Sequence, residues 1–469
     1  MLFRMPAIDR PVSKHFEFNT AVVLINAISW NQAGGGGHFN FTPLMNFQGD
    51  ANKLLEQGPF LDKEHNHVYV SSGAGWYVLP YLFFNTFNLP PTALWLRILS
   101  IFAGLLSFVL LSRLFIQSGM LPGPAHRLSF LFCIMPAPLW YMGIAYVTVG
   151  IMMPFVLWIL LLWNERSTAL SEPTAGWYAQ LFAAGVLLIF FEWYGVFLLA
   201  AIFWWAMLTK MKKQTRLKIA ATAFLAGFTG VMVIFLHFAS YVGFDQVADY
   251  WISRFSSRGF AGINSQHVGH TLQQILQHLL TAFLPLFLLL AWIFLKGKAK
   301  SHKPRWPIFL LVFTGIYNMA FLDWSVVHEF AWMAFGLSTF LFVFLRYDTN
   351  LINHRNRWIF VTLCVFSLAI YFTINLPGNK SLKGLPYTVY AEAGKKISAN
   401  IPDAAFIFSS RTNEKIIEWN ARRTINKAKD IQTAKRIMDS LQLKEGFFLD
   451  LGPEGDPLRF EIKKIPRND

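Results

Sequence analysis

The sequence predicts a mainly α-helical membrane protein: a polytopic bundle of about ten transmembrane helices, followed by a small extracytoplasmic α/β domain. Three observations predict this fold class. Ten apolar stretches occur between residues 94 and 376, most of them near the ~20 residues that cross ~30 Å of hydrocarbon. Their connections carry basic residues very unequally, and after residue 377 the charge rises and long apolar runs vanish. The ten stretches are 94–116, 127–144, 146–163, 178–192, 194–208, 217–240, 275–295, 306–321, 329–346 and 358–376.

The basic residues assign a side of the membrane to every connection. Sixteen lysines and arginines fall in one alternating set of connections, whereas only Arg254 and Arg258 fall in the other. The positive-inside rule makes the basic set cytoplasmic. Residues 1–93, the long loop 241–274 and the tail 377–469 are therefore expected outside the cytoplasm. The basic set comprises Arg113, Arg127, Arg166, Lys210, Lys212, Lys213, Arg216, Lys218, Lys296, Lys298, Lys300, Lys303, Arg305, Arg346, Arg355 and Arg357.

The composition excludes several classes of protein. Hydrophobic residues make up 54% of the 469 residues and charged residues only 14%, far below the ~25% of an ordinary soluble domain. The net charge of +15 comes from the cytoplasmic loops and the far C-terminus, where membrane lipids rather than nucleic acid are the expected partners. Cys133 and Cys364 both lie in apolar stretches, so no disulfide framework is expected. We expect an integral multi-pass protein of a bacterial inner (plasma) membrane.

The outside location of residues 1–93 has a topological consequence. Nothing in them is typical of a spanning helix or a signal peptide, because the apolar run 21–30 is too short. A hydrophilic start of this length does not readily cross a bilayer unaided. We therefore expect a further helix upstream, which would make eleven spans with the N-terminus inside. Within this first loop, the apolar residues of 19–30 recur at helical spacing, which favours a helix lying on the membrane surface.

The two other outside segments have predicted structure of their own. In the tail, residues 404–409 and 446–451 are typical of short strands, and 431–443 of an amphipathic helix. These elements predict the small α/β domain, which contains no Gly-rich phosphate loop or cysteine cluster. The loop 241–274 is expected to contain an interfacial helix at 245–255.

Few ionisable residues are expected on the outside, so each acidic or histidine position can be weighed. Glu17 stands between two phenylalanines, and a partly desolvated carboxylate there fits a general base; the alternative is an acid near the start of the next helix. Glu192 occupies a tight turn between two apolar helices, which fits a structural hydrogen bond or the positioning of a substrate or metal. His328 lies between Asp323 and Glu329 and fits a metal ligand, a phosphate donor or a helix cap.

The outside cations and aromatic residues suggest how a lipid-linked ligand is held. A phosphate at the bilayer surface needs cationic or backbone donors, with arginine favoured for its planar fork. The candidates are Lys53, Arg254, Arg258, His267 and His270; the alternative for each is a solvated loop residue. Tyr69 and Trp76 belong to a glycine-containing segment and fit either stacking on a sugar ring or anchoring at the interface.

These features, in their order and on their common side of the membrane, resemble the GT-C superfamily of membrane glycosyltransferases. The resemblance is to the family 39 protein mannosyltransferases and the lipid A aminoarabinose transferases. It rests on Glu17 near the start of a long first loop, the segment Tyr69–Tyr81, the pair Glu192-Trp193, His328 at a later turn and the small outside tail. It implies that the first helix of the family is missing from this chain.

The resemblance implies an enzyme, a hexosyl- or pentosyltransferase. It would move a sugar from a polyprenyl-phosphate donor to a hydroxyl of a glycan, lipid or protein acceptor on the extracytoplasmic face, with inversion. Glu17 would be the general base, and Glu17→Gln would lower turnover by ~10²–10⁴ in a folded protein. The residues expected to bind substrate are Lys53, Tyr69, Trp76, Glu192, Arg254, Arg258, His267 and His328.

No cofactor is assigned, and the sequence does not require a divalent metal. Besides a non-catalytic scaffold or chaperone subunit, two alternatives to the transferase stay open. One is a polymerase or ligase that joins lipid-linked glycans. The other is a lipid or solute transporter without glycosyl transfer, whose sequence mark would be ionisable residues midway along the spans.

Overall fold

The computed structural model describes most of the chain. The described residues are 8–12, 17–55, 61–142, 150–168, 172–259, 268–296, 298–299, 304–348, 357–375, 388–410, 415–451 and 460–466. They form two compact units. Unit 1 contains Ile98–Leu236 and Trp251–Leu376, and unit 2 contains Met5–Arg97 together with His237–Tyr250 and Pro377–Asp469.

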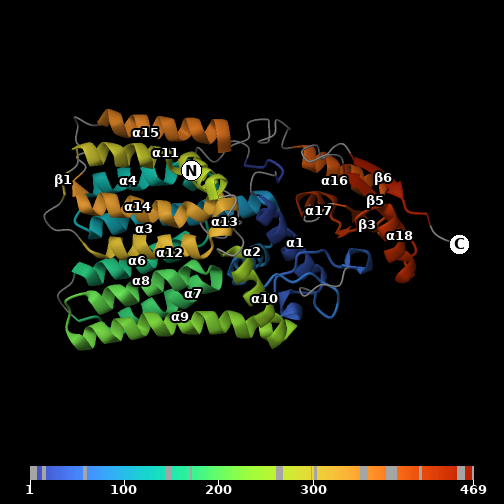
Figure 1. Ribbon diagram of the computed structural model, residues 1–469, viewed down its shortest axis with the longest axis horizontal. Coiled ribbons are helices and arrows are strands. Elements are labelled where there is room, and N and C mark those ends of the chain that lie inside the picture. Colours follow the sequence, from blue (N-terminus) through green and yellow to red (C-terminus); the bar gives the residue numbers. More distant parts are fainter. Residues whose placement is uncertain are drawn as a thin grey trace. The chain divides into compact units, whose positions relative to one another are not determined.

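Unit 1 is a helix bundle, and its long helices run roughly parallel to one another (Figure 1). Helices α3, α9 and α10 contribute residues to both units. The helices are α3 (Ala93–Gln117), α4 (Pro122–Ile134), α5 (Pro136–Tyr141), α6 (Met153–Thr168), α7 (Ala175–Phe191), α8 (Tyr194–Leu208), α9 (Lys213–Val242), α10 (Phe244–Arg258), α11 (Val268–Lys296), α12 (Trp306–Ala320), α13 (Leu322–Val327), α14 (Met333–Arg346) and α15 (Arg357–Ile370). A two-residue ladder pairs β1 (Lys298–Ala299) with β2 (Tyr347–Asp348).

Each of the ten apolar stretches coincides with a helix over all or part of its length. Among the described residues, four helical segments are long and apolar enough to cross a membrane: Ala93–Gln117, Lys213–Val242, Gly269–Ile293 and Glu329–Arg346. Four more apolar helices are shorter: Ala175–Phe191, Tyr194–Leu208, Trp306–Ala320 and Trp358–Thr373. The predicted helical membrane bundle is therefore confirmed in its main part, and the number of spans stays a prediction.

Hydrogen bonds between side chains join neighbouring helices inside the bundle. The Tyr194 hydroxyl lies 3.1 Å from Thr314 Oγ1, which lies 2.9 Å from Ser338 Oγ, so α8, α12 and α14 share one polar ladder. At another point, Trp306 Nε1 donates to Asn164 Oδ1 at 3.1 Å. Where water is scarce, such bonds satisfy polar groups that lipid cannot, and they fix how the helices pack.

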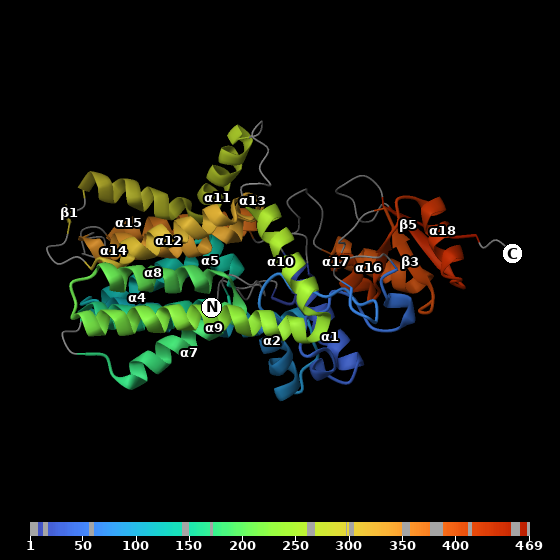
Figure 2. The same cartoon turned by 60° about the horizontal axis from the view of Figure 1, so that its bottom comes forward.

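Helix α11 bends sharply at Phe283, so its two halves point in different directions (Figure 2). Phe283 has non-helical φ and ψ of −137° and 21°, and Pro285 follows two residues later, where it removes a backbone donor. The ring of Phe283 fills the space in front of Gly336 on α14, where a Cβ would lie only 2.3 Å from it. A glycine at this position therefore permits the close approach of the bend.

In unit 2, the first loop folds around α1 (Phe18–Gln32) and α2 (Gly75–Thr86). The expectation that residues 19–30 lie on the membrane surface is wrong, because nearly every side chain from Thr20 to Trp30 is buried. Helix α1 packs against α2 and against a helix of the C-terminal tail, α17 (Lys415–Ala421). A short helix that is apolar on all sides belongs in a protein core, and its spacing alone did not separate that from an interfacial helix.

The C-terminal tail forms a small α/β domain within unit 2, as predicted. Its four-stranded sheet has the order β4-β3-β5-β6, with β3 parallel to β4 and β5, and β6 antiparallel to β5. The predicted strands are β3 (Phe406–Ser409) and β5 (Gly446–Leu451), and the predicted helix is α18 (Ile431–Ser440). The elements that the sequence did not predict are α16 (Val389–Asn400), α17, β4 (Ile425–Lys427) and β6 (Phe460–Lys464).

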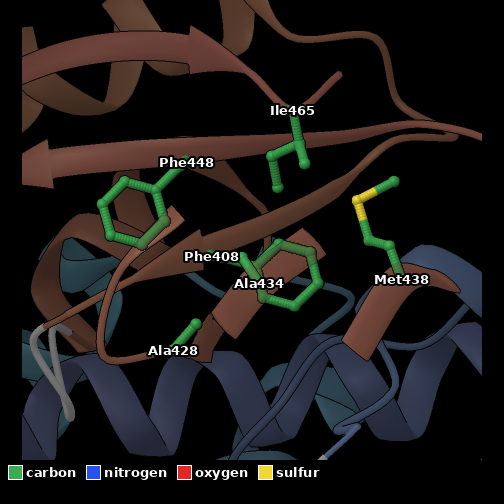
Figure 3. Close-up of a cluster of buried hydrophobic side chains, with 6 residues drawn as sticks. All are labelled: Phe408, Ala428, Ala434, Met438, Phe448 and Ile465. Carbon is green, nitrogen blue, oxygen red and sulfur yellow. The ribbon is translucent and has the colours of Figure 1, made fainter. Parts of the chain in front are cut away.

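Figure 3 shows the core of this domain. Ala434 and Met438 on α18 face Phe408 of β3 and Phe448 of β5. The same cluster includes Ala428 and Ile465, and Leu55 of the first loop packs against it. The first loop thus contributes an apolar side chain to the core of the tail domain.

Hydrogen bonds also join the first loop to strand β4. The side chain of Asn426 accepts from the Leu55 N–H at 3.0 Å, and the Thr424 N–H donates to Asn52 Oδ1 at 2.8 Å. The Phe47 N–H donates to Thr424 Oγ1 at 3.1 Å. The first loop and the tail, distant in sequence, therefore form one structural unit.

Candidate active site

Glu17 is the N-cap residue of α1, and its carboxylate is held by two arginines rather than by the helix. Its side chain is fully buried and makes no capping hydrogen bond. Oε1 accepts from Arg10 Nη2 at 2.8 Å and from Arg97 Nη2 at 2.9 Å. Two guanidinium groups at this distance stabilise the ionised carboxylate and compensate for the burial of three charges. These surroundings are typical of a structural ion-pair network.

Arg97, in the first turn of α3, connects this network to the chain before α1. It is 1% exposed and also donates to the carbonyl oxygens of Ile8 at 2.8 Å and Arg10 at 2.5 Å. Sequence reasoning missed this residue. The sequence did contain an indication of its role: an arginine at the end of an apolar span is costly unless it has a polar or acidic partner.

The other predicted residues of the first loop occupy two places in unit 2. Lys53 donates from Nζ to Asn66 Oδ1 at 2.9 Å and lies 3.6 Å from Glu64 Oε2, with part of its side chain exposed. Trp76 is buried, and its Nε1 donates to Ser72 Oγ at 3.2 Å. Tyr69 packs edge-on against Trp76 at 6.3 Å between ring centroids and keeps more exposed surface. Of the two aromatic residues, only Tyr69 has surface available for a ligand.

In unit 1, Glu192 sits at the turn between α7 and α8. Helix α7 ends at Phe191, and Glu192 has extended φ and ψ of −155° and 144°. Gly195 permits the tight turn, because a Cβ there would lie 2.9 Å from the backbone nitrogen of Ile189. Burial raises the pKa of Glu192 to about 7, against the lowering effects of the Trp193 N–H, the nearby charge of Arg258 and the Tyr317 hydroxyl. A carboxyl group in this range can exchange a proton at neutral pH.

Arg258, at the end of α10, lies close enough to influence both Glu192 and His328. Helix α10 is fixed against the turn by aromatic contacts. The ring of Trp193 lies 4.9 Å from Trp251 and 5.3 Å from Phe255, edge-on in both cases. A guanidinium placed beside a carboxyl and an imidazole supplies a forked donor for an anionic ligand.

His328 follows α13 and precedes the 3-10 turn Glu329–Trp332. Its ring stacks on Phe330 at 4.8 Å and lies 5.8 Å from Trp324. Burial lowers its pKa to about 4, and the charges of Arg258 and His278 act in the same direction. His328 is therefore neutral at pH 7, so it can donate or accept a hydrogen bond but does not attract a phosphate by charge.

The structure thus brings Glu192, Arg258 and His328 together in unit 1, and Tyr317, which the sequence did not single out, forms a hydrogen bond with Glu192. Arg254 lies one turn earlier on α10 and is half-buried. His270 is exposed on α11. The predicted His267 lies outside the described residues. Glu17, Lys53, Tyr69 and Trp76 belong to unit 2.

A metal site was one of the alternatives considered for His328 and Glu192. Among the residues that the structure describes, no group of three histidine, cysteine, aspartate or glutamate side chains is arranged to hold a metal ion. The described part of the site therefore offers hydrogen-bonding and ionic groups, and these are the basis for its chemistry.

Comparison with known proteins places this architecture. No protein-family model and no curated protein matches the sequence. Among solved structures, the chain is similar to ArnT from Cupriavidus metallidurans bound to undecaprenyl phosphate, with a TM-score of 0.57, 11% identity, and coverage of 96% of this chain and 91% of that one. It is also similar to the Archaeoglobus fulgidus oligosaccharyltransferase tethered to an acceptor peptide containing the NVT sequon, with a TM-score of 0.51 and 14% identity.

The second match covers 93% of this chain but only 65% of the archaeal enzyme, so this chain spans about two thirds of its length. At these identities the similarity concerns the fold. Together with the membrane-length apolar helices, it identifies an integral multi-pass membrane protein. The predicted resemblance is confirmed at the level of the fold: over nearly its whole length, the chain is similar to ArnT and to the archaeal oligosaccharyltransferase.

Proposed function

We propose that this protein transfers a sugar from a polyprenyl-phosphate donor to an acceptor hydroxyl on the extracytoplasmic face of the membrane. The observation that carries the proposal is the match, over 96% of this chain, to a structure that holds undecaprenyl phosphate. The cluster of Glu192, Arg258 and His328 at the ends of unit 1 helices supports it. The basic loops, by the positive-inside rule, support the assignment of that cluster to the outside.

The reaction breaks the bond between the anomeric carbon of the sugar and the phosphate oxygen of the donor. The acceptor oxygen forms the new bond from the opposite face, which inverts the anomeric carbon. The protein must then do two things: take the proton of the acceptor hydroxyl and stabilise the charge on the departing lipid phosphate. The phosphate is itself an adequate leaving group, so the proposal requires no nucleotide.

Arg258 suits the second task because its planar guanidinium matches phosphate oxygens. Glu192 suits the first, since burial places its pKa at about 7 while Tyr317 and Trp193 fix the orientation of the carboxyl group. The resemblance implies Glu17 as the base, and that role stays a prediction. The two arginines that contact Glu17 favour the structural alternative.

The proposal can be tested in proteoliposomes that contain the purified chain. Radiolabelled polyprenyl phosphates carrying a hexose or a pentose are supplied, and label is followed into lipid, protein and glycan fractions. We expect transfer by the wild type, a loss of ~10²–10⁴ in Glu192→Gln, and a large loss in Arg258→Ala. Glu165→Gln, an exposed glutamate near the end of α6, is the matched control and should retain full activity.

Other results would point elsewhere. Elongation of a lipid-linked glycan, without transfer to a separate acceptor, would identify the polymerase or ligase alternative. Movement of the labelled lipid between leaflets without any glycosyl transfer would identify a transporter.

A further inference from the structure

Several buried oxygen atoms in unit 1 have no hydrogen-bond partner among the described residues, and two of them belong to neighbouring parts of one turn region. These two are Oε1 of Glu329, a side chain 6% exposed, and Oδ1 of Asn318, 1% exposed. Buried acceptors are nearly always satisfied in native proteins, so each exception calls for an explanation such as a ligand or an ordered water. A buried carboxyl group in a membrane protein is especially costly without a partner.

The two atoms belong to one local structure. Asn318, near the end of α12, donates from Nδ2 to the carbonyl of Ala331 at 3.0 Å, and Ala331 lies in the same 3-10 turn as Glu329. Asn318 Nδ2 also lies 3.3 Å from Ser325 Oγ of α13. The amide nitrogen of Asn318 is thereby committed to the protein, which leaves its oxygen as the group available to a ligand.

This place adjoins the candidate active site. Glu329 follows His328 directly in the chain, and Asn318 follows Tyr317, the tyrosine hydrogen-bonded to Glu192. Phe330, the next residue in the turn, stacks on His328 at 4.8 Å and contacts Trp324 at 5.5 Å between ring centroids. The two residues with unsatisfied oxygens are therefore direct chain neighbours of His328 and Tyr317, two residues of the candidate active site.

The chemistry of the two atoms restricts the ligand. Asn318 Oδ1 accepts hydrogen bonds, and the buried carboxyl group of Glu329 accepts them and, when protonated, also donates one. The part of a glycosylated lipid phosphate that can both donate and accept is the sugar with its hydroxyl groups. The phosphate itself carries only acceptors and negative charge. A metal ion fits less well, because no group of three suitable ligands is found among the described residues.

We infer that Glu329 and Asn318 form a sugar-binding subsite that accepts hydrogen bonds from the hydroxyl groups of the transferred sugar. This inference rests on the proposed function. It adds that the protein recognises the sugar of the polyprenyl-phosphate substrate. The phosphate contributes affinity through Arg258, and the hydroxyl groups contribute selectivity through Glu329. A site with buried polar atoms binds a ligand without hydroxyl groups more weakly, because its own polar atoms are then left without hydrogen-bond partners.

The test measures binding of two probes to the full chain in detergent: a polyprenyl phosphate carrying a hexose or a pentose, and the same polyprenyl phosphate without a sugar. For the wild type, we expect at least one sugar-bearing lipid to bind about 10-fold or more tightly than the bare lipid. Glu329→Gln keeps the side-chain shape but replaces one carboxyl oxygen by an NH2 group and removes the negative charge, so it should lose most of this difference. It should still bind the bare lipid within about three-fold of the wild type, which also shows that the variant is folded.

Glu165→Gln is the control and should retain the full preference for the sugar-bearing lipid. Equal preference in wild type and Glu329→Gln overturns the subsite, and so does a wild type that binds both lipids alike; ordered water would then account for the two atoms. Equal loss of both lipids in Glu329→Gln also overturns it. If the wild type binds neither lipid and transfers no sugar, the proposed function itself fails.

Discussion

Glu17 combines complete burial with two arginine partners, and this combination separates its possible roles. A general base has to approach an acceptor hydroxyl and take up a proton. A carboxylate that already accepts from Arg10 and Arg97 is stabilised in its charged form and occupied by those bonds. Its contribution is then to hold the chain before α1 against the start of α3.

We therefore expect Glu17→Gln to act mainly on stability. The substitution leaves two buried guanidinium groups short of a negative partner, which costs about 3–5 kcal/mol for a buried ion pair. The measurement is the thermal denaturation midpoint of the purified variant in detergent, with transfer activity recorded in parallel. Unchanged stability together with turnover lowered by ~10²–10⁴ would instead support Glu17 as the base.

Glu192 makes a prediction about pH. If it takes the proton, it must be ionised, so kcat should rise as pH increases through about 7 and then level off. Glu192→Gln should remove this rise along with most of the activity. A pH–rate profile between about pH 5 and 9 measures it. His328→Gln is the control: its pKa of about 4 lies below this range, so the rise near pH 7 should persist in that variant.

Ionisation of Glu192 should affect stability in the opposite direction from activity: stability should fall as pH rises. Burial raises the pKa of Glu192 above its value in the unfolded chain, so the folded state favours the protonated form. Its stabilising contribution is present at low pH and is lost as pH rises through about 7. Glu192→Gln should flatten the plot of unfolding free energy against pH between about pH 4.5 and pH 7. A variant that kept the wild-type slope there would show that another group causes it.

Among single residues, the sequence singled out the few ionisable side chains that lie between apolar segments. Glu192 and His328 lie at short turns between apolar helices, where ionisable residues are costly, and this cost indicated a function. Tyr317 and Asn318 could not be found this way, because tyrosine and asparagine near a helix end are ordinary. Their importance depends on how α12 packs against the ends of other elements, and a sequence does not contain that information.

The elements show where periodicity is a reliable signal. The apolar stretches and the tail elements β3, β5 and α18 were predicted because each has a pattern that persists for several turns or residues. Strand β4 has only three residues, and its parallel pairing with β3 defines it. Helix α1 was predicted as a helix, but its environment was not, since apolar spacing cannot tell lipid from the interior of a folded domain.

Helix α16 packs so closely on α17 that a glycine is required between them. A Cβ on Gly394 would lie 2.5 Å from the backbone carbon of Asn420 and 2.7 Å from the backbone nitrogen of Ala421. Backbone atoms cannot move aside cheaply, so Gly394→Ala should destabilise the tail domain by about 1–3 kcal/mol or more. Hydrogen–deuterium exchange of residues 388–451 in the full chain measures this.

Gly446→Ala is the matched comparison within the same domain. Its Cβ would meet the sulfur of Met438 at 2.3 Å, but that atom ends a flexible side chain and can rotate away. We expect a clearly smaller effect than for Gly394→Ala. Equal effects of the two substitutions would show that the α16–α17 contact does not limit stability.

For the whole molecule, the most informative contact joins segments that lie far apart in the chain. Asn426 on β4 accepts from the Leu55 N–H at 3.0 Å and lies 3.4 Å from the carbonyl of Lys53. The loop that carries Lys53 is thereby ordered by the tail domain. A sequence without relatives gives no indication of pairing over such a distance, which is why the first loop and the tail looked like separate regions.

Asn426→Ala should therefore loosen residues 50–55 rather than the tail itself. The Leu55 N–H loses its partner in a partly buried place, at a cost of about 1–3 kcal/mol. We expect faster hydrogen–deuterium exchange at residues 50–55. Asn400→Ala is the control, because the exposed side chain of Asn400 donates, within the described part of the chain, to the carbonyl of Lys396 in its own helix. Increased exchange confined to 415–451 would argue against coupling between the two segments.

The direction of the chain in the membrane determines whether the proposed chemistry is accessible to an extracytoplasmic acceptor. The basic connections predict that Gln214, in the first turn of α9, faces the cytoplasm, and that Gln432, in the first turn of α18, faces outward. Both glutamines are exposed, so Q214C and Q432C form a matched pair in a chain whose Cys133 and Cys364 are replaced by alanine. A membrane-impermeant maleimide should label Q432C in intact cells or spheroplasts and label Q214C only after permeabilisation. Labelling of both from one face would place the tail domain and the basic loops on the same side, and glycosyl transfer to an outside acceptor could then not be performed by this arrangement.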